Sequence, residues 1–285
     1  TLMRNMLAFN VSKMLNMPYT PAGNCVDVIL NGEYKGTYQL CDQIEVQKNR
    51  VNITEMEPTD ITLPNLSGGY LLEIDAYAYN EISWFNSTRG NPVTIHSPDD
   101  DEIVSQQTQY ITNFFNTMEQ EVYGRDFAND NASFRKHLDT KTFLKNFLIG
   151  EFCGNTDTYW STYMYKQRNN DTLYTGPIWD YDLAFENDNR TYPINNLTDF
   201  IYRTNASAAG NMCTFVDNVL ASNASKRELY QLWNEVRSEK LTQLSMLSLV
   251  DSLATLLNSS QKLNFIRWPI MNTLVHQNPV IWGSY

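Results

Sequence analysis

Residues 154–185 read GNTDTYWSTYMYKQRNNDTLYTGPIWDYDLAF, and this stretch sets the organisation of the chain. Alternating apolar and polar side chains over 159–166 predict a β-strand, and a second apolar run over 173–179 predicts its partner. The residues between the two runs, around Asn169, are typical of a tight turn. The stretch therefore predicts a β-hairpin whose two ends lie next to each other.

Acidic side chains lie at both ends of this predicted hairpin. With the turn centred near Asn169, Asp157 is opposite the segment Asp180–Asp182, because residues equidistant from the turn face each other. Side chains paired in this way have Cβ atoms about 5 Å apart. The carboxylates then suit a divalent cation, general-base chemistry, or both. The alternative is a pair of polar strand ends in solvent, which the flanking Trp160 and Trp179 disfavour.

The composition indicates a globular, acidic protein. The chain has 285 residues, of which 42% are hydrophobic and 13% aromatic, enough for one large domain or two lobes. The 21 Lys and Arg against 32 Asp and Glu give a net charge of −11, so nucleic acid is not expected as a partner. No apolar run approaches the roughly 20 residues that span a bilayer. A nucleotide remains compatible with this charge if a metal ion accompanies it.

The chain opens at Thr1 in what reads as the middle of an amphipathic helix, so we expect a fragment with further sequence upstream. The four cysteines lack the spacing of a structural zinc site. Cys25 and Cys41 flank a predicted hairpin, and the sequence leaves open whether they form a disulfide or remain free thiols.

The first third of the chain is rich in predicted strands. A helix is predicted over 2–16, and Asn31-Gly32 within an alternating run is a strong signal for a hairpin. Further strands are predicted over 43–53, 68–79 and 92–96. Residues 24–96 are thus expected to form mostly sheet.

The pattern changes to helix after this region. Ser97 followed by Pro98 predicts a helix start, with the acids 99–102 in its first turn and an apolar face that continues to Val122. Further helices are predicted over 140–153, 212–220, 227–241 and 244–257. The expected fold is α+β, with a sheet-rich N-terminal part over 1–97, a helical C-terminal part over 98–285 that carries the hairpin, and a cleft between them.

The placement of the aspartates fits phosphoryl transfer. That reaction needs metal-held phosphates and an aspartate that accepts the proton of the attacking hydroxyl. In protein kinases the base aspartate precedes a short hairpin and the metal-binding aspartate follows it. Asp157 and Asp180 lie at these two positions, and Asp182 shares a strand face with Asp180 if the segment is extended.

Four segments resemble the CotH family, the spore-coat-protein-H-like atypical protein kinases. The matching motifs are NGEYKGTYQLCDQIEVQKNRVNI at 31–53, GGYLLEID at 68–75, GNTDTYW at 154–160 and GPIWDYDLAF at 176–185. They occur in the family's order and cover roughly residues 1–190. The resemblance implies a protein-kinase-like two-lobed fold with part of the N-lobe missing, and phosphorylation of protein serines with ATP and Mg²⁺ or Mn²⁺.

The resemblance also implies roles for individual residues. Asp157 takes the place of the catalytic base, Asp180 that of the metal-binding aspartate, and Asp182 assists. Thr162 stands where a kinase-like loop has an Asn that holds a second metal, and Asp42 stands where many relatives have Glu. The nucleotide-binding Lys is expected upstream of Thr1.

The function predicted from these features is an atypical protein kinase that phosphorylates Ser or Thr of secreted, coat or surface proteins. The resemblance places such a protein outside the cell, in the cell envelope or in a spore coat. The departure at Thr162 motivates an alternative, a catalytically weak pseudokinase that acts as a cell-surface binding or structural protein. A second alternative is a retaining glycosidase, which uses two carboxylates about 5–5.5 Å apart.

Overall fold

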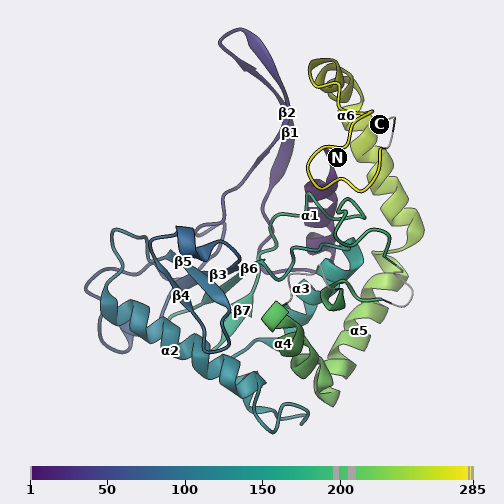
Figure 1. The fold of residues 1–285 in the computed structure, drawn as a ribbon. Helices are drawn as coiled ribbons and strands as arrows, with labels where there is room; N and C mark the ends of the chain where they lie inside the picture. The colour runs from purple at the N-terminus through teal and green to yellow at the C-terminus, as the bar shows by residue number, and fades with distance from the viewer. Residues whose placement is uncertain (1, 195–198, 205–209, 282, 284–285) are drawn as a thin grey trace.

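The computed structural model describes residues 2–194, 199–204, 210–281 and 283 (Figure 1). As the sequence predicts, strands concentrate in the N-terminal part and helices in the C-terminal part. None of the described helices has the length and apolar character needed to span a membrane. The strands are β1 (Gly23–Leu30), β2 (Glu33–Cys41), β3 (Tyr70–Asp75), β4 (Trp84–Asn86), β5 (Pro92–Ser97), β6 (Ser161–Lys166) and β7 (Leu173–Thr175). The helices are α1 (Arg4–Met14), α2 (Ser105–Val122), α3 (Thr140–Cys153), α4 (Gly210–Ala221), α5 (Asn223–Glu239) and α6 (Gln243–Arg267).

The predicted hairpin is confirmed as β6 and β7. Lys166 pairs with Leu173 and Met164 with Thr175, so both pairs are equidistant from a turn in which Asn169 has a φ of 57°. The strands are shorter than predicted, because the chain leaves the ladder after Thr175. β6 also pairs with β3, giving an antiparallel sheet of order β4-β5-β3-β6-β7. The sheet therefore joins strands from both sides of residue 97, where the sequence predicted a boundary between lobes.

The two faces of this sheet differ in chemistry. Leu72, Ile74 and Met164 are buried on the face that α2 covers, in one cluster with Phe115 and Met118 of α2. Figure 1 shows α2 running along the sheet. Since side chains alternate along a strand, Glu73 and its neighbours lie on the opposite face. That face carries the polar side chains described below.

The predicted helix start at Ser97 is wrong. Ser97 is the last residue of β5 and pairs with Leu71 of β3, so its backbone is already committed to the sheet. Helix α2 begins at Ser105, where the Gln107 side chain accepts the Val104 N–H at 3.1 Å. The acids 99–102 thus precede the helix and do not occupy its first turn.

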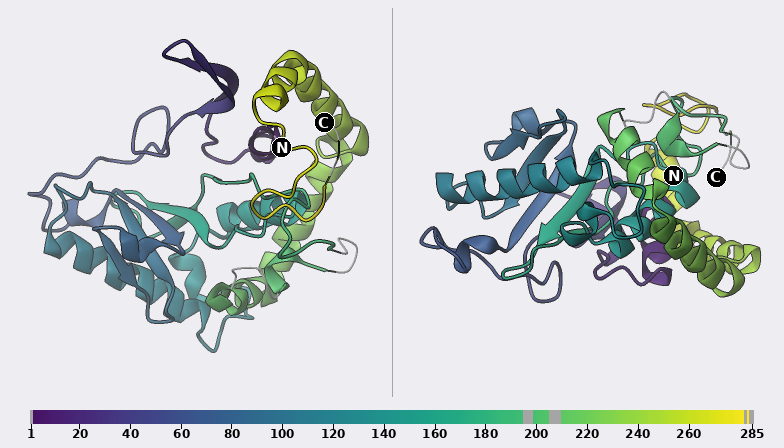
Figure 2. Two further views of the ribbon diagram at one scale, coloured as in Figure 1. Left: turned by 45° about the horizontal axis from the view of Figure 1, so that its top comes forward. Right: turned by 90° about the horizontal axis from the view of Figure 1, so that it is seen from below.

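The β1–β2 hairpin projects away from the five-stranded sheet (Figures 1 and 2). Its turn residues Asn31 and Gly32 have φ values of 52° and 79°, as the Asn-Gly signal predicts. Helix α6 supports the hairpin, because Asn264 Oδ1 accepts the Thr37 N–H at 3.0 Å. A Cβ at Gly36 would lie 2.9 Å from that same oxygen, so the close approach requires glycine. Cys25 and Cys41, offset in register, are both free thiols.

Helix α3 connects the hydrophobic clusters and leads to the hairpin. Asp139 caps its N-terminus, because its side chain accepts the Thr142 N–H at 2.7 Å, and Gly154, which has a φ of 61°, caps its C-terminus. Phe147 packs with the sheet and α2, whereas Ile149 packs with α1 and α5. Because its sides are buried against both halves of the molecule, α3 holds the following loop in a fixed position.

Candidate functional site

Asp157 lies in a tight loop between α3 and β6. Gly150 of α3 lets this loop pack against the helix, because a Cβ there would lie 2.6 Å from the Thr158 hydroxyl. That hydroxyl donates to the Asn155 carbonyl at 2.9 Å, and the buried Asn155 side chain donates to the Asp180 carbonyl at 3.4 Å. The loop that carries Asp157 is therefore tied to the segment that carries Asp180.

Asp180 and Asp182 lie on either side of a buried anchor, Tyr181. The Tyr181 ring belongs to the cluster shared by α1, α3 and α5. The backbone N–H of Tyr181 donates to Asn5 Oδ1 at 2.6 Å. Asp180 has a φ of 59°, in the left-handed region. With Tyr181 fixed inward, both aspartates are exposed. Helix α1 thus fixes the position of the two acids.

The three aspartates are close enough to perturb one another. The pKa of Asp180 is raised to about 7, first because neighbouring atoms desolvate a side chain that still reaches water, and then by a hydrogen bond shared with Asp182 and by the charges of Asp182, Asp157 and Glu73. Burial also raises the pKa of Asp157, and Arg190 opposes that effect. The structure brings Asp157, Asp180 and Asp182 together, as the hairpin register predicts.

Arg190 contacts Asp157 directly. Its Nη2 donates to Asp157 Oδ1 at 2.7 Å and to Asp188 Oδ2 at 2.6 Å. Its Nε donates to Asp188 Oδ1 and Oδ2 at 3.0 and 2.9 Å. Burial acts to raise the pKa of Asp188, but the hydrogen bonds from Arg190 outweigh it and hold that pKa below its ordinary value. The guanidinium is therefore held in one orientation beside Asp157.

A second polar group faces the aspartates from the sheet. Glu73 of β3 is buried and accepts the Ser161 hydroxyl at 2.6 Å, and it contacts His96 Nε2 at 2.7 Å. Tyr163 packs against His96, with ring centroids 5.2 Å apart. Desolvation, followed by the charge of Glu73, raises the pKa of Tyr163 above its ordinary value. Since the charge of Glu73 also acts on Asp180, this group borders the aspartates.

Thr162 is not brought to the aspartates. Its side chain is buried on the α2 face of the sheet, next to Ile74 and Met164, and its hydroxyl donates to the Thr158 carbonyl. The strand alternation explains this placement, because Ser161 and Tyr163 point to the other face. Asp42 is also elsewhere, at the end of β2, where its Oδ2 accepts the Ala22 N–H at 3.0 Å.

The oxygen ligands suit a hard divalent cation bound together with phosphates. Mg²⁺ prefers carboxylate oxygens and usually takes one or two of them, completing its shell with water and substrate phosphates. Asp180 and Asp182 supply two such carboxylates. Among the described residues no three acidic, His or Cys side chains form a ready-made metal site. Desolvation is the main cause of the raised Asp180 pKa, and the charges of Asp182 and Asp157 add to it; a bound cation would relieve that added repulsion.

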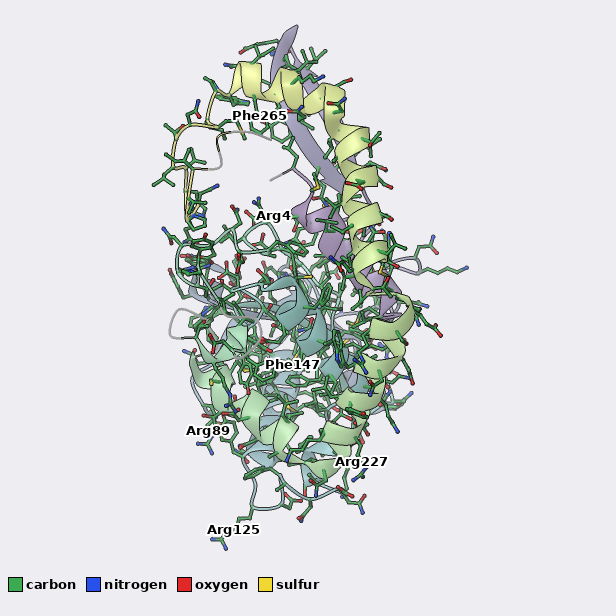
Figure 3. All side chains as sticks on the ribbon, turned by 90° about the vertical axis from the view of Figure 1, so that its right-hand side faces the viewer. Arg4, Arg89, Arg125, Phe147, Arg227 and Phe265 are labelled. Atoms are coloured by element: carbon green, nitrogen blue, oxygen red, sulfur yellow. The ribbon has the colours of Figure 1, made fainter. Side chains whose placement is uncertain are left out.

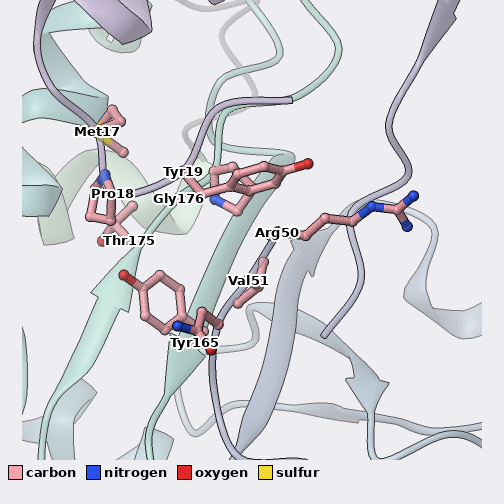
Figure 4. A pocket seen from close by; sticks show the side chains of 10 residues that line it. Met17, Pro18, Tyr19, Arg50, Val51, Tyr165, Thr175 and Gly176 are labelled. Atoms are coloured by element: carbon pink, nitrogen blue, oxygen red, sulfur yellow. The ribbon is translucent and has the colours of Figure 1, made fainter. Parts of the chain in front are cut away.

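Several hollows surround this region. A polar cavity of about 510 Å³ lies between His96 and the segment 43–48, and it includes Lys48. Its size falls within the range of small-molecule sites, roughly 300–1,000 Å³. A smaller cavity of about 110 Å³ lies between Tyr19, Arg50 and the β6–β7 hairpin (Figure 4). The polar cavity has the size for a nucleotide, and it touches His96 of the group around Glu73.

An apolar cavity of about 630 Å³ lies on the other side of α3. Phe147 and Phe152 of α3 and Trp233 of α5 line it, and Glu151 reaches its wall. Glu151 accepts the N–H groups of Ile201 and Tyr202 at 2.6 and 3.1 Å. Burial raises the pKa of Glu151 to about 7, despite these hydrogen bonds. Glu151 thus anchors the turn at 201–203 to α3.

Sequence reasoning missed the residues that surround the aspartates. Arg190 and Asp188 lie in an Asn- and Asp-rich loop without a regular period, so no strand or helix pattern places them. The available signal was that Arg190 is the first cation after four acids, at 180, 182, 186 and 188. Arg4 of α1 was missed as well, although its guanidinium interacts with Asp182, and burial lowers its pKa to about 10.

Comparison with known proteins identifies the family. A family model described as CotH kinase protein matches residues 1–281, nearly the whole chain. A search of curated proteins gave no match. The chain belongs to the CotH kinase family, as the sequence motifs predicted, and the α+β arrangement is consistent with that family's kinase-like fold. The family supports a kinase-like function in general, and it implies the use of ATP and a divalent metal.

Proposed function

We propose that this member of the CotH kinase family transfers phosphate from ATP to Ser or Thr of secreted, coat or surface proteins. The observation that carries the proposal is the convergence of Asp157 with Asp180 and Asp182 at the open end of the β6–β7 hairpin. Phosphoryl transfer requires these two functions side by side, a base for the substrate hydroxyl and ligands for the metal that holds the phosphates.

Asp157 serves as the base in this proposal. Arg190 occupies its Oδ1, whereas its Oδ2 makes no hydrogen bond within the described part of the chain and can accept a hydroxyl proton. Burial raises the Asp157 pKa, which strengthens it as a proton acceptor. The Arg190 contact keeps the carboxylate oriented with one oxygen free.

Asp180 and Asp182 hold the metal in this proposal. The cation supplies positive charge to the phosphates, and the two carboxylates supply its protein ligands. Thr162 takes no part, because its hydroxyl is committed to the Thr158 carbonyl inside the core. The polar cavity beside His96 is the place proposed for the rest of the nucleotide.

A transfer assay tests the proposal. The full chain is incubated with γ-labelled ATP, Mg²⁺ or Mn²⁺ and candidate secreted proteins, and labelled Ser and Thr are counted. We expect label to require the metal, to vanish with EDTA, and to fall at least about 100-fold in Asp157→Ala, because general bases contribute about 10²–10⁴-fold. Equal phosphate transfer by wild type and Asp157→Ala would contradict the proposal.

The alternative is a pseudokinase that acts as a surface binding or structural protein. The observation that favours it is the burial of Thr162, which leaves the position of a second metal ligand without a usable side chain. A thermal shift assay separates the two functions. An increase in Tm with ATP and Mg²⁺ together supports the kinase, because ligand binding to the folded state stabilises it. An unchanged Tm with saturating ATP and either metal supports the alternative.

A further inference from the structure

The buried carboxylate of Asp188 holds Arg190 through several hydrogen bonds. The Asp188 side chain is 1% exposed, and both of its oxygens accept from the Arg190 guanidinium. Asp188 Oδ1 also accepts the Arg190 backbone N–H at 2.9 Å. A buried charge is costly unless it is paired and hydrogen-bonded, so this pair is a fixed unit of the fold. Asp188 therefore leaves the guanidinium very little freedom.

One nitrogen of the fixed guanidinium, Nη1, is left for a further ligand. Nε and Nη2 are used by Asp188 and Asp157, whereas Nη1 makes no hydrogen bond among the residues that the structure describes. The Arg190 side chain is 31% exposed, so it borders solvent beside the aspartates. Nη1 thus offers two N–H donors next to Asp157. Planar guanidinium groups with free donors suit the oxygens of a phosphoryl group.

The electrostatic setting requires a cation at this position. Asp157, Asp180 and Asp182 place negative charge where the negatively charged γ-phosphoryl group of ATP would have to enter. A metal on Asp180 and Asp182 offsets the charge on one side. On the side of Asp157 the cation that the structure shows is Arg190, which contacts that carboxylate at 2.7 Å.

We propose that Arg190 binds the transferred phosphoryl group of ATP through Nη1, with Asp188 as its positioning residue. The inference rests on the proposed kinase function and adds a residue to it. In the reaction, the substrate Oγ forms a bond to the γ-phosphorus, and the bond from that phosphorus to the β,γ-bridging oxygen breaks. ADP leaves with the electron pair, and the hydroxyl proton passes to Asp157. Arg190 stabilises the equatorial oxygens, whose charge is greatest during transfer.

The inference is tested by comparing the affinities for Mg·ATP and Mg·ADP in calorimetric titrations of the full chain. Only ATP carries the group that Arg190 would bind. We expect Arg190→Gln to weaken Mg·ATP binding about tenfold while Mg·ADP binding stays within about twofold, since a charge-assisted hydrogen bond is lost. Arg190→Lys keeps the charge without the planar fork and should give an intermediate loss. Asp188→Asn should lower the ATP preference in the same direction, whereas a merely structural role would weaken both nucleotides alike.

Arg227→Gln is the matched control. Arg227 pairs with Asp130 at the surface of α5 and lies toward the opposite end of the molecule from Arg4 (Figure 3). Its replacement should leave both affinities unchanged. If both Arg190→Gln and Arg190→Lys keep the wild-type preference for ATP over ADP, this inference alone is overturned. A wild-type chain that binds neither nucleotide overturns the proposed function, and the inference with it.

Discussion

Several carboxyl groups of this molecule lie in poorly solvated surroundings that raise their pKa values. Desolvation by neighbouring atoms raises the pKa of Glu151 and Asp180 to about 7 and also raises that of Asp157. The three carboxyl groups differ in location. Asp157 and Asp180 interact electrostatically at the proposed active site, whereas Glu151 accepts backbone N–H groups on the other side of α3. Glu151 is therefore a structural titrating group, and its effect can be separated from catalysis.

Glu151→Gln should remove a pH dependence of stability. The folded-state pKa of about 7 lies above the ordinary value of 4.5, so the folded state binds the proton more tightly. The corresponding stability is fully present below pH 4.5 and is lost as the pH rises through 7. Relative to Glu151→Gln, the free energy of unfolding of the wild type should fall by about 3 kcal/mol between pH 4.5 and pH 9. Urea unfolding of both proteins across this range measures it, and parallel stability curves would contradict it.

The convergence of the aspartates was predictable at the residue scale, but their partners were not. Asp157 and Asp182 are equidistant from the turn at Asn169, so continuing the hairpin register beyond its last pair, Met164 with Thr175, predicts that they lie near each other. Arg190 reaches Asp157 through a loop that has no period, and only the folded chain places it. The analogy to a kinase loop makes Thr162 a candidate metal ligand. Strand alternation turns it into the core, one position away from the residues that face the site.

Helix α3 and the loop after it are the element on which the site depends. The helix is packed on both sides, and its last turn meets the Asp157 loop at Gly150 with no room for a side chain. Its N-cap at Asp139 and its end at Gly154 follow ordinary sequence signals, so the predicted bounds 140–153 are confirmed. The signals at Ser97 and Pro98 misled because the β5 ladder extends to Ser97, and strand pairing outweighs a local helix-start pattern.

Gly150→Ala should displace the Asp157 loop. The added Cβ would lie 2.6 Å from Thr158 Oγ1 and 2.7 Å from its Cγ2, so loop or helix must shift. We expect a loss of about 1–3 kcal/mol in the free energy of unfolding and a lower transfer rate. Thr158→Ala removes both clashing atoms, so the double variant should regain part of both losses. A double-mutant cycle without such coupling would show that the two residues do not share this contact.

The whole molecule is a sheet and two helix-rich clusters joined by α3, with the β1–β2 hairpin extending to α6. The α+β class and the order of elements follow from the sequence, because strand and helix periodicities are local. The pairing of β6 with β3 is long-range, and no local pattern shows that the catalytic hairpin completes the N-terminal sheet. No local pattern predicts the contact of the β1–β2 hairpin with α6 either, because 227 positions separate Thr37 from Asn264.

Asn264→Ala should loosen the projecting hairpin while leaving the core intact. The variant removes the acceptor of the buried Thr37 N–H, and an unpaired buried donor costs about 1–3 kcal/mol. Hydrogen exchange of a peptide covering 33–41 should accelerate about tenfold, and exchange in α3 should not change. Asn258→Ala on the exposed side of α6 serves as the control. Unchanged exchange over 33–41 in Asn264→Ala would show that α6 does not support the hairpin.

The central claim, that Asp157 and Asp180 perform separate steps of phosphoryl transfer, is tested by measuring Mg·ATP affinity and phosphate transfer in the same preparations. Asp157→Asn should bind Mg·ATP within about threefold of wild type and transfer at least about 100-fold more slowly, because only the proton acceptor is lost. Asp180→Asn should lose metal-dependent ATP binding and transfer together. Transfer by Asp157→Asn at the wild-type rate, or Mg·ATP binding by Asp180→Asn at the wild-type affinity, would contradict the account.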